Sequence, residues 1–173
     1  MIETKVLQRQ VRHLLMAFMA GLILSGVTAF PLEWELRIAH QWFQAQDWNN
    51  DLACWVDAVY HGVAETNANY PFIAYGTDWL AFAHLVIAVA FIGPLRDPVR
   101  NIWVIEFGLI ACAAIFPLAF IAGSMRGIPF YWQLIDCSFG VSGGGLLWIC
   151  YRKVKRMEVI SYRLALQIRR TKA

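Results

Sequence analysis

The sequence predicts an all-α integral membrane protein: a bundle of four transmembrane helices with an external helical segment on the membrane surface. Three observations support this fold class. First, 59% of the 173 residues are hydrophobic and only 16% are charged, which is too apolar for a soluble domain of this length. Second, the apolar residues gather in four stretches. Third, basic residues flank these stretches unevenly. We expect one membrane domain over residues 1–173.

Four stretches with almost no charge define the spans: residues 14–30, 79–95, 102–122 and 128–151. A hydrocarbon core about 30 Å thick needs about 20 helical residues, with about 17 as the lower limit. The first two stretches therefore recruit neighbouring residues, and the expected spans are about 13–30, 76–95, 101–122 and 129–151. The first stretch is long for a signal peptide and is followed by no clean cleavage site, so we expect it to be retained.

The basic residues predict the orientation. If the N-terminus, the loop 96–100 and the tail 152–173 lie on one side, that side holds 13 of the 15 lysine and arginine residues. Basic loops stay in the cytoplasm. We therefore expect an inner or plasma membrane protein with both termini cytoplasmic and residues 31–75 external. The basic residues then determine the membrane topology and contact the lipid bilayer. Nucleic acid is not an expected partner.

The external segment 31–75 is acidic and rich in tryptophan and tyrosine, which favour the headgroup level of a membrane. Apolar spacing predicts two helices in it, over residues 32–45 and 50–64. Asn49 and Asn50 supply capping chemistry for the second helix. The break at residues 67–71 leads into the second span.

The tail 152–173 carries eight basic residues and one acidic residue, Glu158. Its apolar residues alternate with period two, which is typical of a strand, whereas its leucine, alanine, glutamine and arginine content favours a helix on the cytoplasmic membrane surface. We expect the helix.

Small residues predict where the spans pack, because membrane helices approach one another through such residues. The first span offers Ala17, Gly21 and Ser25 at four-residue spacing, and the fourth offers Gly140 and Gly144. Other membrane subunits, or a second copy of this chain, are candidate partners for such faces.

Asp136 is the most unusual residue of the spans, because a carboxylate inside a membrane helix is costly and often functional. One interpretation is a structural ion pair with Arg126, which would lock the hairpin of the third and fourth spans. The other is a ligand pocket in the outer leaflet. Three further polar residues are expected in the same region: Asp78, His84 and Gln133.

Asp57, His61 and Glu65 recur every four residues along the expected external helix, so they form one stripe. Carboxylate and imidazole groups in this arrangement can bind zinc, manganese or iron. A solvated polar face explains the same pattern. The metal interpretation strengthens if His40 or Asp78 lies nearby.

The sequence contains no nucleophile–histidine–acid order, no glycine-rich phosphate loop and no CxxC or redox-active cysteine pair, and it assigns no cofactor. Our leading hypothesis is a non-catalytic subunit or a protein that binds a lipid or small ligand, with an outer-leaflet pocket near Arg126 and Asp136. One alternative is a membrane enzyme that acts on a lipid-like substrate at the outer face, with or without a metal. Another is a small transporter.

Overall fold

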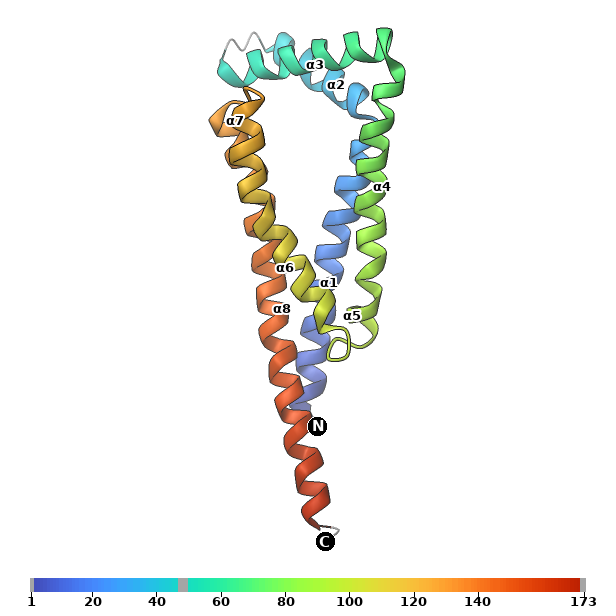
Figure 1. Ribbon diagram of the computed structural model, residues 1–173, viewed down its shortest axis with the longest axis vertical. Helices are drawn as coiled ribbons and strands as arrows, with labels where there is room; N and C mark the ends of the chain where they lie inside the picture. Colours follow the sequence, from blue (N-terminus) through green and yellow to red (C-terminus); the bar gives the residue numbers. More distant parts are fainter. Residues whose placement is uncertain (1, 47–49, 172–173) are drawn as a thin grey trace. The chain divides into compact units, whose positions relative to one another are not determined.

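The computed structural model describes residues 2–46 and 50–171, and none of these residues lies in a strand. The elements follow in chain order as α1 (Ile2–Ala29), α2 (Leu32–Ala45), α3 (Asp51–Asn69), the 3-10 turn η1 (Pro71–Ile73), α4 (Tyr75–Ala90), α5 (Ile92–Arg96), α6 (Ile102–Pro117), the π-helical turn η2 (Leu118–Ala122), α7 (Gly123–Met125) and α8 (Phe130–Thr171) (Figure 1). The prediction of an all-α chain is confirmed.

Four helical stretches are long and apolar enough to cross a membrane: Glu3–Ala29, Pro71–Arg96, Ile102–Met125 and Phe130–Leu164. These match the four expected spans, although two of them continue beyond the apolar stretch. Large apolar side chains on these helices remain exposed, for example Leu24, Ile110 and Phe139. Exposed leucine, isoleucine and phenylalanine in such numbers fit a chain whose solvent is lipid.

The chain divides into two compact units, residues 1–20 with 89–173 and residues 21–88. In the first unit α6 packs along α8. The buried residues of α8 recur three, four or seven positions apart, which is the spacing of a helix packed along one side: Gln133, Cys137, Gly140, Leu147, Cys150, Val154 and Met157.

Glycines set the close approach of α6 and α8. A Cβ atom added to Gly108 would lie 2.6 Å from Leu147 Cδ1, and one added to Gly140 would lie 2.8 Å from the backbone oxygen of Cys112. A larger residue therefore has no room at Gly140, where the close atom belongs to the backbone, and at Gly108 it would require Leu147 and Phe91 to shift. Small residues allow helix backbones to approach in this way when lipid supplies no driving force for association.

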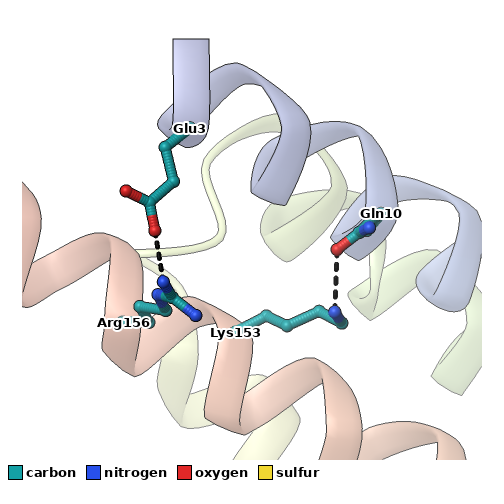
Figure 2. A network of polar contacts seen from close by, with 4 residues as sticks. All are labelled: Glu3, Gln10, Lys153 and Arg156. Carbon is teal, nitrogen blue, oxygen red and sulfur yellow. Dashed lines mark hydrogen bonds and ion pairs between the residues drawn. The ribbon is translucent and has the colours of Figure 1, made fainter. Parts of the chain in front are cut away.

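The beginning of α1 runs antiparallel to the C-terminal half of α8. Figure 2 shows the ion pair of Glu3 with Arg156 and the hydrogen bond that Lys153 Nζ donates to Gln10 Oε1 at 2.7 Å. Further along α1, Phe18 lies beside Gly143 of α8. The buried residues of α1 in this unit, Leu7, Val11 and Leu15, occupy the stripe between these contacts.

In the second unit, α2 and α3 pack side by side and lie across the ends of α1 and α4 (Figure 1). Asn50 begins α3, and its Oδ1 accepts a hydrogen bond from the amide of Ala53 at 2.9 Å. Gly26 of α1 meets α4, since a Cβ atom there would lie 2.9 Å from the backbone oxygen of Ala81. We call the α2–α3 pair with η1 the cap.

Several boundaries differ from the sequence-based expectations. The helix expected over 32–45 has these bounds, but α3 continues to Asn69, five residues beyond the expected end. The capping role expected for Asn49 lies outside the described residues. The described part of the tail is helical to Thr171, and within it there is no separate surface helix, because α8 continues from Phe130 to Thr171 without a break. Its 42 residues extend about 63 Å at about 1.5 Å per residue, twice the thickness of a hydrocarbon core.

Candidate functional site

An open pocket of about 640 Å³ lies in the second unit, where the ends of two candidate spans meet the cap. It is bounded by the start of α2, the second half of α3, η1 and the start of α4. Its apolar wall consists of Phe30, Pro31, Leu32, Trp34, Val59, Val63, Ile73 and Ala74, and its polar residues are Glu33, Arg37, Thr66, Asn67, Thr77 and Asp78. Such a lining, mainly apolar with a few polar groups, is typical of a binding site for an organic molecule.

Some polar residues of the pocket form hydrogen bonds within the protein, and others form no ion pair in the described residues. Asn67 Nδ2 donates a hydrogen bond to Glu33 Oε2 at 2.7 Å, which connects α3 to α2. The Thr77 hydroxyl donates to a backbone oxygen at 2.6 Å. Within the described part of the chain, neither Arg37 nor Asp78 forms an ion pair. Both charges are therefore available to a ligand.

Of the residues expected around an outer-leaflet pocket, only Asp78 lines this one. His84 lies farther along α4, where its Nδ1 is 2.8 Å from the backbone oxygen of Leu80. This hydrogen bond within the helix satisfies one ring nitrogen, as is common for a histidine at a packed position.

Arg126 and Asp136 belong to the first unit, and the ion pair expected between them is not formed. Arg126 is exposed in the turn after α7, directly before Gly127, whose φ of +70° reverses the chain. Gln133, not Asp136, closes this turn: its Nε2 donates a hydrogen bond to the backbone oxygen of Ile128 at 2.8 Å. Gln133 is 3% exposed and packs against Gly123.

The residues expected to pack the spans behave differently on the two helices. Gly140 is buried against α6, and a Cβ atom on Gly144 would make an ordinary contact with Cys112 at 3.5 Å. Ala17, Gly21 and Ser25 of α1 are exposed instead. The stripe of α1 that packs is formed mainly by larger residues, and Gly26 is its point of close approach to α4.

Three potential metal ligands gather in the cap. Asp57 Oδ1 lies 3.1 Å from His40 Nδ1 and 3.5 Å from His61 Nε2. Asp57 and His61 were expected in such a site from their spacing on α3. The third member is His40 of α2 and not Glu65. His40 could not be predicted from spacing along one helix. It lies on α2, and the packing of α2 against α3 brings it close to Asp57 and His61.

Comparison with protein-family models, curated proteins and solved structures returned no match to this chain. Its function is therefore inferred from its own residues and geometry.

Proposed function

We propose that this chain is a non-catalytic membrane protein that binds an amphiphilic, lipid-like molecule in the pocket between the cap and the ends of α1 and α4. The observation that carries this proposal is the pocket itself. Its apolar lining includes Phe30, directly after one candidate span, and Ile73 and Ala74, within another, and its charged groups lie on α2 and at the start of α4. An acyl chain matches the apolar wall, and a polar headgroup matches the charges.

The charges favour a zwitterionic headgroup. Arg37 presents a guanidinium group, which binds phosphate well because its N–H donors match two phosphate oxygens. Asp78 and Glu33 present carboxylates, which attract an ammonium group. A phosphoethanolamine headgroup carries both of the complementary charges. The pocket lies in the second unit, so this proposal replaces the earlier hypothesis of a pocket beside Arg126 and Asp136.

The proposed setting is the inner or plasma membrane, with both termini cytoplasmic and the cap on the outer face. The distribution of lysine and arginine supports this orientation. The exposed aromatic residues of the cap support its location at the headgroup level, since tryptophan and tyrosine are enriched there. They include Trp34, Trp42 and Phe72, together with Tyr70 between α3 and η1.

Cross-linking with a photoreactive phosphatidylethanolamine in nanodiscs tests the proposal. Gly62 lines the pocket, and a Cβ atom on it would meet nothing within 4 Å, so Gly62→Leu introduces a bulky side chain at the pocket wall and reduces the space for a ligand. Gly76→Leu is the matched control, because Gly76 is equally open and lies outside the lining.

We expect cross-links on the α3 segment 59–67 in the wild type and in Gly76→Leu, and a strong loss in Gly62→Leu. Both variants should keep the helical content of the wild type by circular dichroism. Equal labelling of all three proteins would overturn the proposal, as would labelling spread evenly over the lipid-exposed helices.

A further inference from the structure

A cluster of potential metal ligands lies in the cap, apart from the ligand pocket. It consists of His40 on α2 and of Asp57 and His61 on α3, and their ligand atoms all lie within 4.8 Å of one another. On α3, Asp57 and the pocket residue Val59 are two positions apart, which turns them about 200° from each other around the helix. The cluster and the ligand pocket therefore use different faces of α3.

The distances in the cluster suit a small divalent ion. In a tetrahedral zinc site with ligand bonds of about 2.0–2.2 Å, neighbouring ligand atoms lie about 3.3–3.6 Å apart. The carboxylate oxygen of Asp57 lies 3.1 Å from the His40 nitrogen and 3.5 Å from the His61 nitrogen. All three ligand atoms lie within 4.8 Å of one another, so an adjustment of the side chains can bring them to one ion.

The cluster is held in place by its surroundings. The ring of His40 stacks on the ring of Tyr60, with centroids 4.8 Å apart, and its side chain is only 19% exposed. Asp57 and His61 are four residues apart on one helix, which places them on the same face. Farther along, the hydrogen bond between Asn67 and Glu33 fixes the register of α3 against α2. Preorganised ligands of this kind reduce the cost of metal binding.

We propose that His40, Asp57 and His61 bind one divalent transition-metal ion, of which zinc is the best match. Two imidazoles and one carboxylate form a common ligand set for zinc, whereas magnesium and calcium prefer oxygen ligands alone. The side chains of His61 and Asp57 are 65% and 42% exposed, so the fourth coordination position opens to solvent. The bound ion connects α2 to α3 and thereby stabilises the cap.

The competing interpretation is a hydrogen-bonded group in which the Asp57 carboxylate accepts from both imidazoles and no metal binds. The two interpretations differ in one measurable respect. A hydrogen-bonded group has no affinity for Zn²⁺ above that of any exposed histidine. A metal site loses most of its affinity when any one of its three ligands is removed.

The test uses the whole chain of residues 1–173 in detergent, stripped of metal and titrated with Zn²⁺ against a chromophoric chelator. Stoichiometry is measured by plasma mass spectrometry on the same samples. The ligand variants are His40→Gln, Asp57→Asn and His61→Gln. Glu65→Gln is the matched control, because it removes a carboxylate from the same helix without removing a member of the cluster, and His84→Gln controls for a histidine elsewhere.

We expect one Zn²⁺ per wild-type chain and a loss of affinity of about 100-fold or more in each ligand variant, since even residues that only orient ligands contribute about 10–100-fold. The two control variants and Gly62→Leu should bind Zn²⁺ as the wild type does, which separates this proposal from the ligand pocket. Excess Mg²⁺ should not compete.

Wild-type affinity in His61→Gln would overturn the proposal. This variant decides the question even if the partly buried His40 proves necessary for folding, because the His61 side chain is largely exposed. Substoichiometric Zn²⁺ on the wild type, or displacement of Zn²⁺ by equimolar Mg²⁺, would also overturn it.

Discussion

The Asn67 side chain donates a hydrogen bond to the Glu33 carboxylate at 2.7 Å, across 34 residues of sequence. Together with the contact between His40 and Asp57, it shows that α2 and α3 run antiparallel, because the partner number falls from 67 to 57 as the chain advances from 33 to 40. Both Asn67 and Glu33 line the pocket. The bond therefore shapes the cap and the candidate site at once.

We expect Asn67→Ala to destabilise the cap by about 1–2 kcal/mol, because hydrogen bonds to charged groups contribute about 1.5–3 kcal/mol and this one is only partly buried. Lipid cross-linking in the pocket should also fall. Thermal unfolding followed by circular dichroism measures the first effect. Glu33→Gln is the control, since its amide oxygen still accepts the hydrogen bond. Equal melting temperatures for Asn67→Ala and the wild type would contradict the role of this bond.

The proposed orientation can be tested through one thiol. Cys54 is exposed on α3, whereas Cys112, Cys137 and Cys150 are buried. A membrane-impermeant maleimide added to intact cells should therefore label the wild type but not Cys54→Ser. In a Cys54→Ser background, Arg163→Cys places a thiol on an exposed position of the basic tail and should react only after the membrane is permeabilised. Labelling of Arg163→Cys in intact cells would reverse the proposed orientation.

The contact between α6 and α8 predicts different effects on stability for alanine substitutions at two glycines of α8, Gly140 and Gly145. In Gly140→Ala the new methyl group would lie 2.8 Å from the backbone oxygen of Cys112, which cannot swing aside. We expect a loss of about 1–3 kcal/mol, the usual cost of overpacking. Gly145→Ala meets nothing within 4 Å and should be neutral or stabilising, because alanine favours helices by about 1 kcal/mol over glycine.

Denaturation in mixed micelles, followed by circular dichroism, measures both variants. Gly144→Ala, whose methyl group would make only an ordinary contact at 3.5 Å, should fall between them. The prediction fails if Gly140→Ala and Gly145→Ala unfold at the same denaturant concentration.

The apolar stretches predicted the four long helices correctly, because helix formation within lipid depends on local composition and length. The cap helix Leu32–Ala45 was also predicted with its observed bounds. The end of α3 was predicted too early, because the polar run at residues 67–69 remains helical where Asn67 contacts Glu33. A contact between distant residues thus overrode a local signal.

The sites were harder to predict, since each depends on which faces of the helices meet. The small residues Ala17, Gly21 and Ser25 indicated one packing face of α1, but these three are exposed, and the buried residues described on α1 are Leu7, Val11, Leu15 and Gly26. In the cluster of His40, Asp57 and His61, spacing on α3 indicated Asp57 and His61, but it indicated Glu65 as the third member where the structure has His40. Spacing along one helix carries no information about its neighbour.

Two kinds of contact hold the start of α1 against the tail of α8: an exposed ion pair and buried apolar side chains. Their contributions to stability can be measured separately. Glu3 and Arg156 are more than half exposed, and such ion pairs contribute about 0–1 kcal/mol. Leu7 lies one turn away and is only 7% exposed, so Leu7→Ala removes buried apolar contacts at a cost of about 2–3 kcal/mol. We therefore expect Leu7→Ala to release the start of α1 and Glu3→Gln to leave it in place.

Limited proteolysis of the purified protein measures this release, because a freed N-terminal segment is cut before the helices within the micelle. Leu7→Ala should be cleaved within residues 2–12 at a protease concentration that leaves Glu3→Gln and the wild type intact. Raising the salt concentration should leave the wild type resistant, since screening weakens the ion pair but not the apolar contact. If Glu3→Gln is cleaved as readily as Leu7→Ala, the charged contacts of Figure 2 hold the two helices together, and the buried stripe does not.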